Sequence, residues 1–113
     1  MNANETISKL VENGGNLWEK GSMRRVYFDA ATILEHAGIK INYYNSGSIS
    51  SATQNGEKIS NGAAKSIRDA VESAKYFWDA ADSEFHIQDR FGTLGSSKSI
   101  VKEFFASLRE QIN

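Results

Sequence analysis

The stretch MRRVYFDAATILEHAGIKINYY, residues 23–44, carries the strongest local structure signals of the chain. In its first arm, Val26 and Phe28 alternate with polar or amphipathic residues, which is the period of a strand with one buried face. Asp29 is placed to cap a helix, and Gly38 is placed to end it. Alternation resumes after that glycine. The sequence therefore predicts a strand, a short helix and a second strand in close succession.

The segments on either side of this stretch predict antiparallel hairpins. Asn55-Gly56 is a strong turn signal because both residues tolerate a positive φ. Strand-like arms also flank two other short polar turns. Three hairpins are expected, with turns at Lys20–Ser22, Gln54–Gly56 and Ala80–Ser83.

Helical periodicity appears in four segments, residues 5–13, 30–37, 61–75 and 96–113. The last segment has the widest apolar stripe, so we expect it to be a structural helix, or a helix that a partner completes, and not a free tail. Because the strands follow one another through short turns, the predicted fold class is α+β. We expect one compact domain over residues 1–113, with an antiparallel sheet built from hairpins and about four helices packed mainly on one face.

Composition limits the class of protein. The chain has 113 residues, with 13 Lys and Arg against 14 Asp and Glu and a formal net charge of −1. This balance argues against a strongly basic DNA-coating protein and against an acidic DNA mimic. The chain has no cysteine, which excludes disulfides, cysteine-based zinc sites and thiol nucleophiles.

The sequence shows no targeting or membrane signal. The N-terminal residues have no basic region followed by an apolar run, and no stretch approaches the roughly 20 apolar residues of a membrane span. Neither end carries a lipidation motif. Together with the absence of cysteine, these features lead us to expect a cytoplasmic protein with no membrane partner.

Residues 45–70 have a superficial likeness to a phosphate-binding loop. In such a loop the lysine directly follows the second glycine, so that it reaches the β- and γ-phosphates. Here two alanines separate Gly62 from Lys65. The glycines are better explained as turn and helix-start residues, and we expect no nucleotide or other cofactor.

No catalytic or metal-binding residue is assigned. The two histidines, His36 and His86, lie far apart in the sequence without a closely spaced third ligand. The serines lack the context of a hydrolase nucleophile, and no carboxylate pair has a distinctive spacing. An enzyme with an unrecognised site, such as a small hydrolase, is the third alternative for the function.

The most unusual feature is the interleaving of aromatic and basic residues on the predicted strands. Alternation places Arg25 and Tyr27 on the face opposite Val26 and Phe28. We expect an exposed patch that contains Arg25, Tyr27 and at least one further ring from Tyr44, Tyr76 and Trp78. The candidate binding residues are Trp18, Arg24, Arg25, Tyr27, Lys40, Tyr44, Tyr76 and Trp78.

The same alternation predicts which neighbouring rings are buried. We expect one ring of the pair Tyr43 and Tyr44, and one of the pair Phe77 and Trp78, to point into the core.

Three explanations of this patch stay open at the level of sequence. The rings could serve ordinary strand packing. They could form a protein-binding surface, because Tyr, Trp and Arg dominate interface hot spots. They could also stack on unpaired bases of a single-stranded nucleic acid. A net-basic face would favour nucleic acid, and a face of mixed charge with exposed rings would favour protein.

The leading hypothesis is a small non-enzymatic interaction or regulatory protein, of the adaptor or inhibitor type. It would dock on another protein through the aromatic-rich sheet face or the C-terminal helix. The alternative is a single-stranded nucleic-acid binder that uses the same strands.

Overall fold

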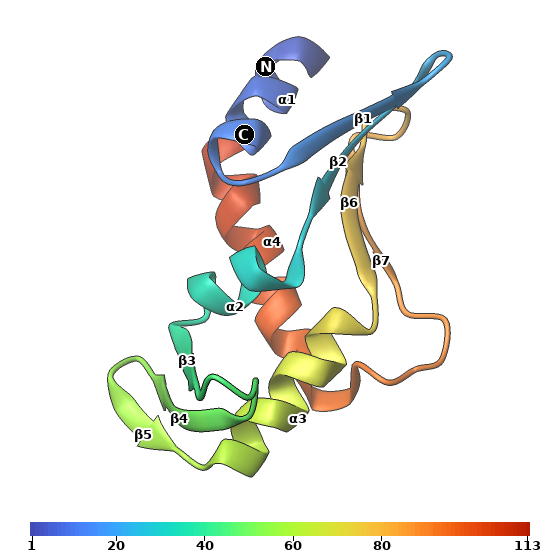
Figure 1. Cartoon of the computed structure of the whole chain (residues 1–113). Coiled ribbons are helices and arrows are strands. Elements are labelled where there is room, and N and C mark those ends of the chain that lie inside the picture. Colours follow the sequence, from blue (N-terminus) through green and yellow to red (C-terminus); the bar gives the residue numbers. More distant parts are fainter.

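The computed structural model describes residues 1–113 and confirms the α+β class, with four α-helices and seven strands (Figure 1). All strand pairs are antiparallel, as the hairpin signals predict. The strands divide between two sheets, one with four strands and one with three.

The four-stranded sheet has the order β1-β2-β6-β7, so β1 and β7 form its two edges. It consists of two hairpins that pair along β2 and β6. The strands are β1 (Asn16–Lys20), β2 (Met23–Phe28), β6 (Lys75–Asp79) and β7 (Glu84–Gln88).

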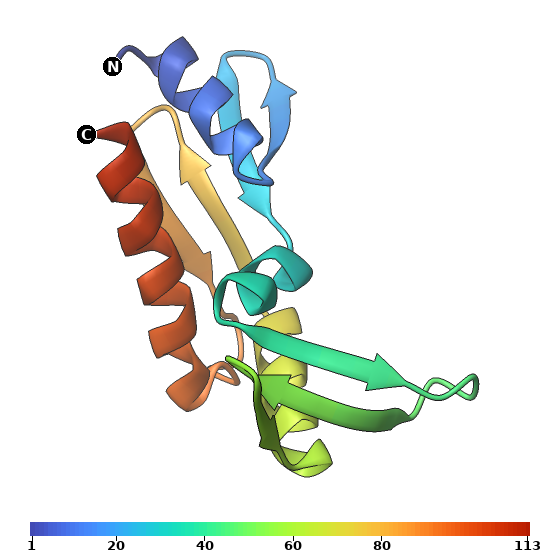
Figure 2. The same ribbon diagram turned by 90° about the vertical axis from the view of Figure 1, so that its left-hand side faces the viewer.

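The three-stranded sheet projects away from the first one (Figure 2). Its strands are β3 (Ile39–Tyr43), β4 (Ile49–Gln54) and β5 (Glu57–Ile59). The predicted Asn55-Gly56 turn forms, with φ of 52° and 84°. Gly38 ends α2 (Ala30–His36) at a φ of 74°, and its carbonyl accepts a hydrogen bond from the Asn55 N–H at 2.8 Å. This bond continues the pairing of β3 with β4 as far as the end of α2.

The other helices are α1 (Ala3–Glu12), α3 (Asn61–Glu72) and α4 (Lys98–Ile112). A short 3-10 helix, η1 (Gly95–Ser97), precedes α4. Side chains cap the first three helices. The oxygens of Asn2, Asp29 and Ser60 each accept a hydrogen bond from a backbone N–H in the first turn of α1, α2 and α3. In Figure 1 the helices lie on one side of the four-stranded sheet, and none covers its opposite, outer face.

The core lies between this sheet and α4. The Phe28 and Phe104 rings lie 5.1 Å apart, and the Phe85 and Phe105 rings stack at 4.7 Å. The apolar stripe of α4 is buried at Val101, Phe104, Phe105 and Leu108. The prediction that the C-terminal helix is structural is therefore confirmed, and its apolar stripe is used inside the molecule.

Candidate functional site: the outer face of the four-stranded sheet

The outer face carries one aromatic ring from each strand. Strand register places Tyr27 opposite Phe77, and Phe77 opposite His86. Trp18 of β1 completes the set, which we call the aromatic row: Trp18, Tyr27, Phe77 and His86. The row crosses the whole sheet because residues on one pleat of neighbouring strands lie side by side.

The rings of the aromatic row contact one another in sequence. Trp18 meets Tyr27 edge-on, with ring centroids 6.3 Å apart, and Tyr27 lies 5.1 Å from Phe77. Phe77 and His86 stack at 5.1 Å. The neighbours cover Phe77 so well that only 3% of it is exposed, although it faces outward, whereas Trp18 is 37% exposed.

Arg25 lies over the aromatic row. Its Cζ is 4.5 Å from the Phe77 ring centre and 5.8 Å from that of Trp18. Its Nη1 donates to the Tyr27 hydroxyl at 3.2 Å, and its Nε donates to Asp79 Oδ2 at 3.1 Å. Cation–π contacts and hydrogen bonds together fix a side chain that would otherwise be mobile.

These contacts shift the pKa values of Arg25 and Asp79. The hydrogen bond to Tyr27 is the main cause that raises the pKa of Arg25, and Asp79 adds to it. The pKa of Asp79 is lowered, first by the Ala81 N–H that donates to its Oδ1 at 2.9 Å and then by Arg25. Both groups are charged at neutral pH, and Arg25 Nε lies 3.1 Å from Asp79 Oδ2.

The outer face has charges of both signs. His86 Nε2 lies 2.8 Å from Asp82 Oδ2, beside the turn between β6 and β7. Strand alternation gives the face three basic and two acidic residues, namely Lys20, Arg25, Lys75, Asp79 and Glu84. This is a face of mixed charge with exposed rings.

The structure brings together three of the eight candidate binding residues, Trp18, Arg25 and Tyr27. Arg24 lies on the opposite pleat, and its Nη1 donates to Asn4 Oδ1 of α1 at 2.7 Å. Lys40 lies on β3 and Tyr44 directly follows it, so both belong to the other sheet. Tyr43 and Tyr44 are both exposed, which corrects the expectation that one of them is buried.

Tyr76 and Trp78 are buried in the core, with 1% and 2% exposed. The expectation that Tyr44, Tyr76 or Trp78 joins Arg25 and Tyr27 is therefore wrong. The physical reason is strand register, which pairs Tyr76 with the inward-facing Phe28 and Trp78 with the inward-facing Val26.

Phe77 and His86 occupy the outer face in place of Tyr76 and Trp78. In KYFWD both faces of the strand carry rings, so alternation alone could not tell inside from outside. His86 could have been found from the alternation of EFHIQ, in which Phe85 and Ile87 share the inner face.

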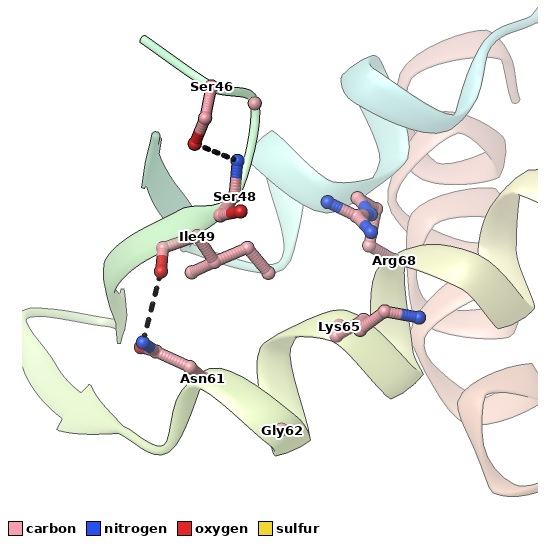
Figure 3. A pocket seen from close by; sticks show the side chains of 8 residues that line it. Ser46, Ser48, Ile49, Asn61, Gly62, Lys65 and Arg68 are labelled. Atoms are coloured by element: carbon pink, nitrogen blue, oxygen red, sulfur yellow. Dashed lines mark hydrogen bonds between the residues drawn. The ribbon is translucent and has the colours of Figure 1, made fainter. Parts of the chain in front are cut away.

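A separate pocket of about 550 Å³ lies between the loop before β4 and the start of α3 (Figure 3). It is lined mainly by polar residues. Its two cations, Lys65 and Arg68, bind the same carboxylate, Asp69, at 2.8 Å and 3.0 Å. Lys65 is the first cause of the lowered pKa of Asp69, and Arg68 is the second. The positive charge beside this pocket is therefore partly balanced, by one carboxylate that both cations share.

No group of three or more His, Asp and Glu side chains is placed to hold a metal ion. None of the helices combines the length and apolar character that crossing a bilayer requires. No family model, curated protein sequence or solved structure matches the chain.

Proposed function

We propose that this chain is a small non-enzymatic interaction protein of the regulatory type, which acts in the cytosol by docking on another protein. The docking surface is the outer face of the four-stranded sheet. The observation that carries the proposal is the aromatic row, which no helix covers and over which Arg25 is fixed (Figure 1).

The chemistry of this face suits a protein partner. Trp, Tyr and Arg are the residue types most enriched in interface hot spots. Met23, on the same pleat as Arg25, is 45% exposed and extends the apolar surface. Because Arg25 is held by Tyr27 and Asp79 before any partner binds, little side-chain entropy is lost on docking.

The mixed charge favours a protein over a single-stranded nucleic acid. A stacking platform for bases needs free ring faces next to unpaired cations. Here Arg25 and His86 lie against the Phe77 ring, and Arg25 is paired with Asp79. Binding of a single-stranded nucleic acid is therefore the alternative, and the experiment must distinguish it from protein docking.

The test is affinity capture with the tagged chain, with and without nuclease, followed by quantitative binding of the captured partner. Trp18→Ala is the main variant because Trp18 is the most exposed ring of the row. Tyr44→Ala is the matched control, since Tyr44 is 62% exposed but follows the other sheet. We expect Trp18→Ala to weaken binding by roughly thirtyfold, as loss of a hot-spot ring does, with the melting temperature nearly unchanged.

Two outcomes would count against the proposal. One is capture that disappears after nuclease treatment, which would indicate nucleic acid. The other is equal affinity of the Trp18→Ala variant and the unmodified chain for every captured protein.

A further inference from the structure

A groove of about 420 Å³ separates β7, an edge strand, from α4. The two elements run side by side in roughly opposite directions (Figure 2). The floor of the groove is apolar and its helix side is basic. The floor is formed by Phe85, Ile87 and Phe105, and the basic side by Lys98, Lys102 and Arg109.

The three cations form a stripe along one side of α4. Their spacing of four and seven residues keeps them on one helix face, next to Phe105 and apart from Glu103 and Glu110. None of the three cations forms an ion pair within the chain. The groove therefore has positive charge that no carboxylate of the protein pairs with, whereas Lys65 and Arg68 share Asp69.

The side chains around the groove pack against one another. Phe85 stacks on Phe105, and the Arg109 Cζ lies 5.2 Å from the Phe85 ring centre. On the β7 side, an edge strand presents backbone N–H and C=O groups that have no neighbouring strand. Such an edge binds extended peptides by adding them to the sheet.

We propose that this groove binds an acidic peptide in an extended conformation, which adds to β7 as a fifth strand of the sheet. Side chains at alternate positions of such a strand, about 6.8 Å apart, point toward α4. Lys98 and Lys102 are about 6 Å apart along the helix axis. Carboxylates at positions i and i+2 of the peptide therefore match the two lysines, while their methylene groups lie on the apolar floor.

Other occupants fit the groove less well. If a second copy of the chain paired through β7, its own Phe85 and Ile87 would enter the groove. These side chains are apolar, so the positive charges of the basic stripe would have no negative partner. A nucleic acid would supply negative charge but could not continue the backbone hydrogen bonds of β7. Both are separate outcomes of the experiment.

The experiment measures fluorescence anisotropy of a labelled peptide in which Glu alternates with Thr and Val. One control peptide has Lys in place of every Glu. Another keeps the same number of Glu but has Pro at two adjacent central positions, which removes one backbone donor on each side of the strand without changing the charge. The protein variant is Lys98→Gln with Lys102→Gln. Its matched control is Lys40→Gln with Lys58→Gln, two exposed lysines of the other sheet.

We expect saturable binding of the Glu peptide that weakens as salt is raised. Loss of Lys98 and Lys102 should weaken it by at least about tenfold, and the control pair by less than about twofold. The Pro peptide should bind at least about tenfold more weakly than the Glu peptide, and the Lys peptide should not bind. Trp18→Ala should leave this binding unchanged, so failure here is distinguishable from failure of the aromatic row as a docking site.

Four results would overturn the proposal. These are no saturable binding of the Glu peptide, equal binding of the Glu and Pro peptides, tighter binding of a single-stranded oligonucleotide of the same charge, and a stable dimer in sedimentation that excess Glu peptide does not dissociate. Near-ultraviolet circular dichroism of each variant shows that a loss of binding is not a loss of fold.

Discussion

Tyr76 carries a hydroxyl group into the core and uses it at the end of α3. Its Oη donates to the Val71 carbonyl at 2.7 Å. That carbonyl is among the last four of the helix, which lack the usual partner within the helix. Burial raises the pKa of Tyr76 to about 12, and the negative charge of Asp89 adds to the effect. The neutral side chain is therefore a helix-capping group as well as a core residue.

We expect Tyr76→Phe to lower the free energy of unfolding by about 1–2 kcal/mol, because the buried carbonyl loses its donor. Urea denaturation at neutral pH measures the change. Since the folded pKa lies above the ordinary value of 10.0, the stability that this hydroxyl contributes is complete below pH 10 and is lost as the pH rises toward 12. The difference between the two proteins should therefore narrow over that range. A constant difference would argue against the hydrogen bond as its source.

Gly15 joins α1 to β1 where no side chain fits. A Cβ placed there would lie 2.3 Å from Val26 Cγ1 and 2.9 Å from the Leu10 carbonyl oxygen. We expect Gly15→Ala to lower the free energy of unfolding by about 1–3 kcal/mol, as overpacking does. Thermal or urea denaturation measures it.

Gly62 provides the matched control for this prediction. It lies in the first turn of α3, and a Cβ there would meet no atom within 4 Å. Gly62→Ala should raise the free energy of unfolding by roughly 0.5–1 kcal/mol, because alanine restricts the unfolded chain and favours the helix. Similar effects of the two substitutions would contradict the close approach described for Gly15.

Residue-level prediction of the candidate site succeeded where polar and apolar residues alternate. Arg25 and Tyr27 were placed correctly because Val26 and Phe28 mark the buried pleat of their strand. The same argument could not predict which of Tyr76, Phe77 and Trp78 point into the core, because three rings follow one another. Their direction depends on pairing with β2, a contact between segments about fifty residues apart.

Among the elements, α4 provides much of the core. Its Phe104 ring lies 5.1 Å from Phe28 and is 3% exposed. We expect Phe104→Ala to lower the free energy of unfolding by about 3–5 kcal/mol, through lost burial and the cavity that remains. Glu103→Ala, on the exposed side of the same helix, should change it by about 0.5 kcal/mol or less. A chain ending at residue 95 that still unfolds cooperatively would contradict this role of the helix.

The elements themselves were largely predictable, but their assembly was not. Turn and capping signals are local, so the hairpins and helices could be located from neighbouring residues. The division into two sheets depends on which hairpins pair with each other. That choice is made by the pairing of β2 with β6, which has no local signature in the sequence.

At the scale of the whole molecule, the two sheets differ in how much of each is buried. The four-stranded sheet supplies five buried residues, Val26, Phe28, Tyr76, Phe77 and Trp78, whereas the three-stranded sheet supplies Ile39 and Ala52. We expect backbone amides of β3, β4 and β5 to exchange with solvent through local opening, at a lower free energy than those of β2 and β6. Hydrogen exchange followed by NMR measures the opening free energy of the amides in each sheet. Equal protection of the two sheets would show that they unfold as one unit.

The central place of α4 also affects how the chain folds during synthesis. All four strands of the larger sheet leave the ribosome before the helix that covers their apolar face. At about 5–20 residues per second, the interval between completing β7 and completing α4 is on the order of 1–5 s. During that interval Phe28 and Phe85 have no ring of α4 to pack against. We therefore expect the nascent chain to bind holding chaperones until α4 has cleared the exit tunnel.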